Sequence, residues 1–66
     1  MDLNDAIRMA EIGGHVRDDA TMATDWTVRY VPEEKLLYLF RPSGERYRKL
    51  LISDAMRASF QWRMIS

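Results

Sequence analysis

The chain has 66 residues, of which 47% are hydrophobic, and it contains no cysteine. This length allows one small domain spanning residues 1–66, and the hydrophobic content is typical of a folded protein. Without cysteine the chain can form no disulfide, thiolate nucleophile or cysteine metal site. No run approaches the roughly 20 apolar residues of a membrane span, and the first residues are acidic where a signal peptide is basic. We therefore expect a cytoplasmic protein.

The first predicted element is a helix that begins after Asp2, a typical N-cap residue. Its apolar residues recur at intervals of three and four positions, which is the spacing of one helical face. They are Leu3, Ala6, Ile7 and Ala10. Gly13 and Gly14 end the helix, because glycine tolerates the left-handed conformation that closes a helical turn. Residues 15–25, which include the only histidine, are then expected to form a connector.

Alternation of apolar and polar residues predicts a strand over residues 26–31, in which Trp26 and Val28 face the same side. A turn that begins at Pro32 follows this strand, because proline presets the backbone for a turn. Residues 36–41 are apolar on both faces, as expected for an interior strand that the helix covers.

A second turn, a third strand over residues 46–52, a helical turn and a last strand complete the chain. Ser53 can cap the helical turn at residues 54–59, and Trp62 lies on the apolar side of the last strand, residues 60–65. The sequence thus predicts an α+β fold. One N-terminal helix packs on a small three- to four-stranded antiparallel sheet, with a short helical turn before the last strand.

No set of residues points to catalysis or to a bound cofactor. His15 with Asp18 and Asp19 offers one imidazole and two carboxylates, but the chain has no second histidine and no cysteine to complete a metal site. A serine could accompany His15 in a catalytic triad, yet the nucleophile motif G-x-S-x-G does not occur. Gly13 and Gly14 are not followed by the G-K-[ST] of a phosphate-binding loop. We expect a protein that is not an enzyme and holds neither metal nor cofactor.

The two halves of the chain differ in charge, although the net charge is zero. Residues 1–34 contain eight acidic and three basic residues, and residues 35–66 contain two acidic and seven basic residues, so their net charges are −5 and +5. If the halves present different faces, one face will attract cationic partners and the other anionic ones. If the strands interleave, the signs will mix in space.

Six acidic residues form the candidate partner-binding surface. One group lies at the helix end and in the connector, and the other lies in the turn after the strand over residues 26–31. They are Glu11, Asp18, Asp19, Asp25, Glu33 and Glu34. The strand between the groups spans about 20 Å, a distance at which rows of carboxylates can imitate DNA phosphates. The alternative is a solubilising surface.

Basic residues of the second half alternate with tyrosines on the predicted strands. A sheet face that carries them could bind phosphates and stack on bases. The residues are Tyr38, Arg41, Arg46, Tyr47, Arg48 and Lys49. Because the chain is neutral overall, ordinary solvated strand faces explain this pattern better, and no direct contact with nucleic acid is expected.

The order of helix, Gly-Gly-His-Val-Arg segment, tryptophan-led strand, hairpin and final tryptophan strand resembles the Thoeris anti-defence domain of phages. The matching segments are residues 5–7, 13–17 and 53–65, at the two ends of the chain. The resemblance implies a sponge that binds cyclic nucleotide immune signals between the subunits of a homo-oligomer. The basic set for this role would be Arg17, Arg46, Arg48 and Lys49. The family's Trp-Asn-Gly segment is absent, and the two aspartates that stand there would repel a phosphate.

The small size, the lack of cysteine and the segregated acidic residues also resemble the small anti-CRISPR proteins of phages and mobile elements. This second resemblance implies a non-enzymatic inhibitor that occupies the DNA-binding surface of a type I CRISPR effector complex in the cytoplasm of a bacterial host. The residues that would stand in for backbone phosphates are Asp18, Asp19, Asp25, Glu33 and Glu34. We expect this function first and the nucleotide sponge second, in a monomer or small homo-oligomer.

Overall fold

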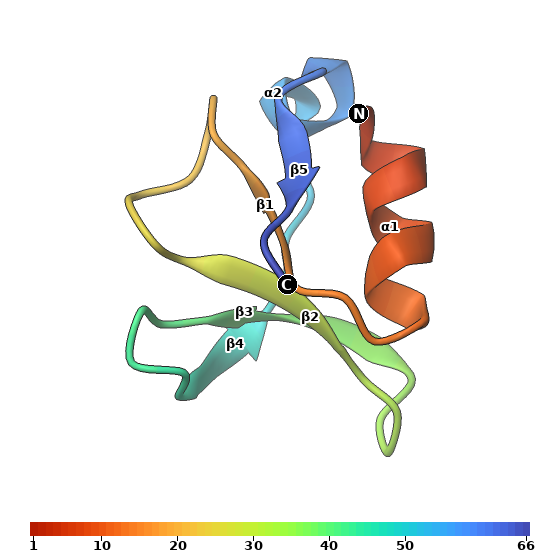
Figure 1. Cartoon of the computed structure of the whole chain (residues 1–66), viewed down its shortest axis with the longest axis vertical. Helices are drawn as coiled ribbons and strands as arrows, with labels where there is room; N and C mark the ends of the chain where they lie inside the picture. The colour runs from red at the N-terminus through yellow and green to blue at the C-terminus, as the bar shows by residue number, and fades with distance from the viewer.

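The structure is a computed structural model that describes residues 1–66, and it confirms the α+β fold. Two helices and five strands follow one another along the chain (Figure 1). Their bounds are α1 Leu3–Glu11, β1 Val16–Asp18, β2 Thr27–Val31, β3 Leu36–Phe40, β4 Arg46–Lys49, α2 Asp54–Ala58 and β5 Trp62–Met64. No helix is both long enough and apolar enough to cross a membrane.

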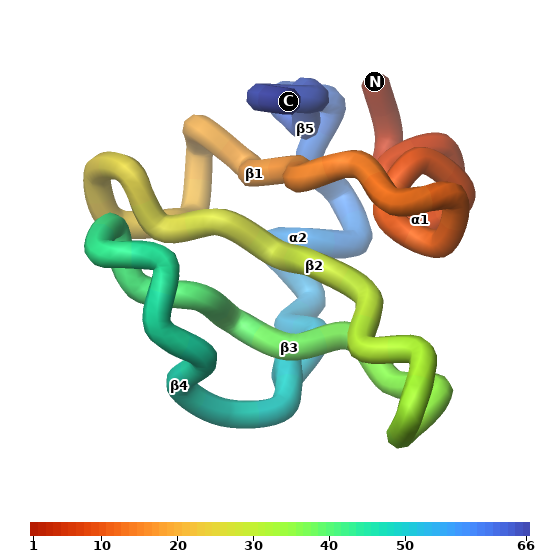
Figure 2. The backbone as a smooth tube through the Cα atoms, turned by 60° about the horizontal axis from the view of Figure 1, so that its bottom comes forward, coloured from red at the N-terminus to blue at the C-terminus, as the bar shows by residue number.

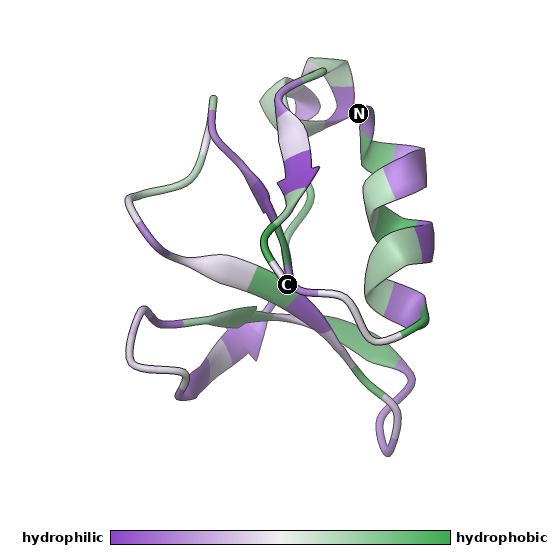
Figure 3. Ribbon diagram, viewed as in Figure 1, coloured by the Kyte–Doolittle hydropathy of each residue, from purple (hydrophilic) through white to green (hydrophobic).

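Helix α1 forms where the sequence predicts it. The Asp2 carboxylate accepts a hydrogen bond from the main-chain N–H of Asp5 at 2.9 Å, which satisfies one of the unpaired donors of the first turn. The buried residues of its inner face are Leu3, Ala6 and Ala10. Figure 3 shows apolar residues on the side of α1 toward the sheet and polar residues on the outer side. Gly13, with φ of 103°, provides the left-handed residue after the helix.

The five strands form one antiparallel sheet in the order β4-β3-β2-β1-β5, which Figure 2 shows from β4 at the bottom to β5 at the top. Helix α1 lies against β1, β2 and β5. Helix α2 packs on the same side, where the indole N–H of Trp62 donates to the main-chain oxygen of Met56 at 3.2 Å. The core between them consists of Leu3, Ala6, Ala10, Val16, Val28 and Trp62. Both helices therefore cover one face of the sheet, and no element covers the other.

The sheet contains a strand that the sequence analysis assigned to a connector. Val16–Asp18 pairs with β5, where Arg17 lies opposite Arg63, and with β2, where Val16 lies opposite Val28. A strand of three residues is too short to show an alternation that can be recognised in the sequence. The sheet therefore has one strand more than expected.

Strand β4 is shorter than the predicted residues 46–52 and pairs irregularly. The register shifts between Leu39 and Phe40, so that Arg48 pairs with Leu39 whereas Arg46 pairs with Phe40. Residues that pair directly across an antiparallel ladder share a face of the sheet. Arg46 and Arg48 therefore lie on opposite faces, although their spacing in the sequence predicted the same face.

Two connectors lie at one end of the sheet and a third lies at the opposite end. In Figures 1 and 2 the segment of residues 19–26 and the β3–β4 turn at residues 41–45 lie at the same end, whereas the β2–β3 turn at residues 32–35 lies at the other. A strand of five residues such as β2 spans about 17 Å. The acidic residues of segment 19–26 are therefore far from those of the β2–β3 turn.

Candidate functional site

The face of the sheet that the helices leave uncovered is rich in arginine. Pairing places Arg17 of β1 opposite Arg63 of β5, and Arg29 of β2 opposite Tyr38 of β3. These residues point away from the helices because they alternate with the core residues of β1 and β2. Arginines from three neighbouring strands thus share one surface.

A hollow of about 330 Å³ opens on this face. The charged side chains in its lining are those of four arginines and of Asp25, so arginine is in excess among them. We call this surface the arginine hollow and define it by His15, Arg17, Asp25, Arg29, Arg41 and Arg63. A concave site on which arginines converge is suited to phosphate or carboxylate groups.

Arg17 is buried and holds the connector between β1 and β2. Its Nη1 donates to the main-chain oxygens of Ala23 at 2.9 Å and Trp26 at 3.0 Å, and its Nη2 donates to that of Met22 at 3.2 Å. Its Nε donates to the Asp19 carboxylate at 2.7 Å. Each nitrogen of the guanidinium is engaged within the protein, so Arg17 gives the hollow its shape and a positive charge.

Asp19 bridges two arginines at the edge of the arginine hollow. Its Oδ2 accepts from Arg63 Nε at 2.6 Å, while its Oδ1 accepts from Arg17 Nε. Both hydrogen bonds lower the pKa of the Asp19 carboxyl, and the one from Arg63 has the larger effect. The side chain of Arg63 is 59% exposed, and its hydrogen bonds run to Asp19 alone.

Two further arginines lie over aromatic rings. The Arg29 guanidinium is 4.5 Å from the centre of the Phe40 ring, and the Arg41 guanidinium is 4.4 Å from the centre of the Tyr47 ring. Arg29 donates one hydrogen bond, to a neighbouring threonine. Arg41 Nε lies 3.5 Å from the Glu45 carboxylate and makes no hydrogen bond. Stacking holds both guanidinium groups in place, and the Nη groups of both make no hydrogen bond to a protein acceptor.

His15 contributes a neutral polar group to the rim of the hollow. Partial burial and then the positive charge of Arg29 lower the pKa of the imidazole below its ordinary value of 6.5. Its Nδ1 lies 3.0 Å from the hydroxyl oxygen of Ser66, with which it forms a hydrogen bond. The imidazole is therefore uncharged at neutral pH, and the positive charge of the site comes from the arginines.

A second hollow, of about 280 Å³, is lined by residues of the β1–β2 connector, β3, β4 and α2. We call it the aromatic hollow and define it by Met22, Trp26, Leu39, Tyr47, Arg48 and Met56. The rings of Trp26 and Tyr47 pack edge to face with their centres 5.3 Å apart. Arg41 lies over both rings and also lines the arginine hollow. Arg41 thus contacts the rings of the aromatic hollow, on the helix side of the sheet, and also lines the arginine hollow on the uncovered side.

Asp18 is not a surface residue. It is fully buried, and its carboxylate accepts hydrogen bonds from the hydroxyls of Ser59 and Thr21, both at 2.6 Å, and from the main-chain N–H of Ala20 at 3.2 Å. Alternation along β1 turns this side chain to the same side as Val16. Asp18 is thus inaccessible to a partner, which corrects the predicted acidic surface.

Two more of the predicted acidic residues are neutralised by arginine. Asp19 bonds to Arg17 and Arg63. The Glu34 carboxylate accepts from the Tyr38 hydroxyl and, at 3.0 Å, from Arg46. The remaining three form no ion pair and lie at the end of α1, at the rim of the arginine hollow and in the β2–β3 turn; they are Glu11, Asp25 and Glu33. The six acidic residues therefore do not form one negative face.

The four basic residues of the alternative anion site are also separated. Arg17 lies in β1, whereas Arg46, Arg48 and Lys49 lie in the edge strand β4, with β2 and β3 between them. The register shift turns Arg48 toward the aromatic hollow, away from Arg46. Within one copy of the chain these residues do not make a single site.

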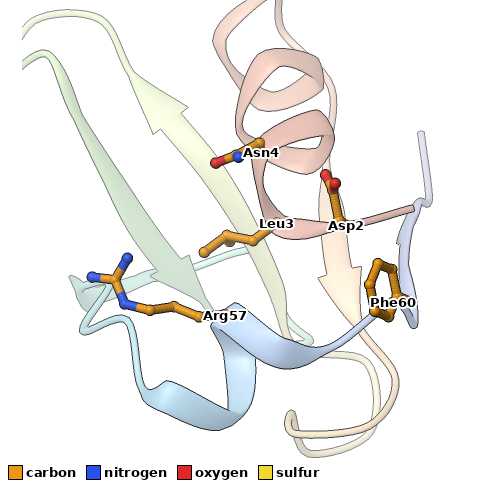
Figure 4. Close-up of a pocket in the computed structure, with 5 residues that line it drawn as sticks. All are labelled: Asp2, Leu3, Asn4, Arg57 and Phe60. Atoms are coloured by element: carbon orange, nitrogen blue, oxygen red, sulfur yellow. The ribbon is translucent and has the colours of Figure 1, made fainter.

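The two remaining hollows fit an anion less well. One, of about 230 Å³, lies at the start of α1, and its only charged residues, Asp2 and Arg57, have opposite signs. Figure 4 shows Arg57 and Phe60 on opposite sides of this hollow. The other, of about 380 Å³, is mainly apolar and lies between α1 and the segment after β4. No three histidine or acidic side chains come together as metal ligands would.

Arg29, Arg41 and Arg63 are not predicted as a group by the sequence. The alternation of Arg29 with Val28 was a signal that Arg29 points outward. No local pattern could group it with Arg41, which follows β3, or with Arg63 of β5, because the order of strands in the sheet decides which of them are neighbours.

Comparisons with family models, with curated proteins and with solved structures find no match to this chain.

Proposed function

We propose that the protein is a non-enzymatic binding protein that sequesters a small phosphate-bearing nucleotide in the arginine hollow. The observation that carries this proposal is the convergence of four arginines, with Asp25 as the one acidic side chain of the lining, on the face of the sheet that no helix covers. Arginine binds phosphate through parallel N–H groups, which gives both attraction and a defined geometry.

Arg29 and Arg41 would make the direct contacts with the phosphate. Their guanidinium groups are already held against Phe40 and Tyr47, so little side-chain freedom is lost when a ligand binds. The Nη groups of both make no hydrogen bond within the protein, while Arg41 Nε is buried beside Glu45. Arg17 would act at a distance, through its charge.

The aromatic hollow supports a nucleotide over a simple phosphate. Stacking of a base on an aromatic side chain contributes about 1–3 kcal/mol. Trp26 and Tyr47 offer ring surfaces beside the thioether groups of Met22 and Met56. The base would stack on these rings at the end of the sheet, beside Arg41, while the phosphate binds Arg41 from the arginine hollow.

Of the two functions expected from the sequence, this is the nucleotide sponge, acting on a cyclic nucleotide signal in the cytoplasm of a phage-infected bacterium. The second, an inhibitor that imitates DNA toward a CRISPR effector subunit, has less physical support. Imitation needs a continuous row of free carboxylates, whereas Asp18 is buried and Asp19 and Glu34 are paired with arginines.

The test is a thermal-shift screen with cyclic mono- and dinucleotides, followed by calorimetric titration of the ligand that stabilises most. Arg29→Gln and Arg41→Gln each remove a charged hydrogen-bond donor, which contributes about 1.5–3 kcal/mol, so we expect binding to weaken about tenfold or more. The control is Arg8→Gln, which removes an arginine with a 75% exposed side chain on the outer side of α1. It should bind like the wild type.

The proposal is wrong if no nucleotide raises the melting temperature. It is equally wrong if the Arg8→Gln control loses as much affinity as the two hollow variants, since the loss would then reflect net charge alone.

A further inference from the structure

Asp19 occupies a position between two arginines that a ligand phosphate could also take. Arg17 and Arg63 lie directly opposite each other on β1 and β5, where two like charges repel. The Asp19 carboxylate lies between them, 2.7 Å from Arg17 Nε and 2.6 Å from Arg63 Nε. Carboxylate and phosphate oxygens accept the same charge-assisted hydrogen bonds from arginine. The anion between these two arginines is thus a side chain of the protein itself.

The two halves of this bridge differ in their freedom to move. Arg17 is 8% exposed, and its other nitrogens bond to main-chain oxygens, so it cannot turn away. Arg63 is largely exposed and has Asp19 as its one hydrogen-bond partner. Exposed ion pairs contribute little to stability, so their partners exchange readily. The contact between Asp19 and Arg63 is therefore the one that a ligand can break.

We infer that Asp19 is an internal competitor for the arginine hollow, and that a ligand phosphate must displace it from Arg63 to bind there. This inference rests on the proposed function and adds a determinant of affinity to it. The phosphodiester of a cyclic nucleotide carries one negative charge, as Asp19 does, so it displaces Asp19 through the additional contacts with Arg29 and Arg41, whereas pyrophosphate also brings more charge. The internal contact also lowers the affinity for every ligand, because part of the binding free energy is used to break it.

A purely structural role for Asp19 predicts the opposite outcome. If Asp19 only ties the β1–β2 connector to β5, its removal should loosen the hollow and weaken binding. If Asp19 competes with the ligand, its removal should leave Arg63 free and strengthen binding. The direction of the change in affinity separates these roles.

The test uses the 66-residue chain with inorganic pyrophosphate as the probe, titrated calorimetrically. Asp19→Asn keeps the size of the side chain and removes its charge. We expect this variant to melt at a lower temperature and yet to bind pyrophosphate about tenfold more tightly. The matched control is Asp25→Asn, because Asp25 also lines the hollow but pairs with no arginine. It reports the general effect of removing one negative charge and should strengthen binding less.

A second pair of measurements ties the effect to Arg63. When Arg63→Gln is already present, Asp19→Asn should no longer strengthen binding, since the competition acts through Arg63. In the wild-type protein, the NMR signal of the Arg63 Nε–H should move when pyrophosphate is added, while that of Arg17 should stay. This last readout needs no variant and therefore holds even if Asp19→Asn does not fold.

The inference alone is overturned if pyrophosphate binds the wild type and Asp19→Asn binds it equally or more weakly, or gains no more than Asp25→Asn. The inference is also overturned if the NMR signal of the Arg63 Nε–H does not move at saturating pyrophosphate. If folded wild-type and Asp19→Asn proteins bind neither pyrophosphate nor any nucleotide, the proposed function fails and the inference falls with it.

Discussion

The carboxylate of Asp18 joins three segments of the chain at one buried point. Ser59 precedes β5, Thr21 and Ala20 belong to the connector after β1, and all three donate hydrogen bonds to it. A buried carboxylate without an opposite charge is tolerated only when its oxygens are satisfied by such donors. Asp18 therefore fixes the connector against the segment that leads into β5.

Asp18→Ala should destabilise the protein by about 2–4 kcal/mol. The substitution removes these hydrogen bonds and leaves the buried Ser59 hydroxyl without its acceptor. Urea unfolding followed by tryptophan fluorescence measures the loss. Glu33→Gln changes an exposed acid without an ion pair and should stay within about 0.5 kcal/mol of the wild type. Equal free energies of unfolding for the two variants would contradict the role of Asp18.

At the scale of elements, the connector between β1 and β2 is organised by one side chain of β1. Arg17 bonds to the main-chain oxygens of Met22, Ala23 and Trp26. The same connector carries Asp25, whose φ of 64° is a left-handed conformation that aspartate tolerates better than most residues. Because the connector contributes to both hollows, their shapes depend on Arg17.

Arg17→Lys should loosen this connector although it keeps the charge. One ammonium nitrogen cannot bond to three main-chain oxygens and a carboxylate at the positions that the guanidinium reaches. We expect a loss of about 1–3 kcal/mol in the free energy of unfolding and faster amide hydrogen exchange over residues 22–26. Hydrogen exchange followed by mass spectrometry measures the second effect. Arg57→Lys, an exposed change in α2, serves as the control, and unchanged exchange in Arg17→Lys would refute the expectation.

At the scale of the whole molecule, the opposite charges of the two halves meet. Glu34 of the first half pairs with Arg46 of the second, and Asp19 pairs with Arg63. The acidic half of the sequence therefore has no separate negative face in the fold. The arginines that carry the arginine hollow come from both halves, since Arg29 precedes residue 35 and Arg41 and Arg63 follow it.

Acid should destabilise the molecule through these pairs. Hydrogen bonds, chiefly from Arg63 and from the Tyr38 hydroxyl, lower the pKa of Asp19 and of Glu34 below their ordinary values of 3.8 and 4.5. Because each folded-state pKa is below the unfolded one, the unfolded state binds protons first as the pH falls. The stabilisation is complete above about pH 5 and is lost as the pH falls through the lowered values.

Urea unfolding at about pH 7, 5 and 3 measures this dependence. The double variant Asp19→Asn/Glu34→Gln should lose less stability between pH 5 and pH 3 than the wild type does. Glu33→Gln is the control in the same turn and should follow the wild type. The same acid dependence in all three proteins would show that other groups are responsible.

The parts of the fold that could be predicted are those in which neighbouring residues determine the outcome. The helix α1 follows from its apolar spacing and the Asp2 cap, and the capping of α2 by Ser53 follows from the same rule. Strand β1 and the register shift opposite Phe40 were missed because they depend on a partner strand. The candidate site was missed for the same reason.

By itself the sequence determined the order of most elements and the inner side of α1, because periodicity and capping act over a few positions. Only the tertiary structure decided which charges meet. Asp19 and Arg63 are 44 positions apart and become partners through the pairing of β1 with β5. A three-residue strand carries too little pattern to determine its own register, so the packing of the whole core places the arginines together.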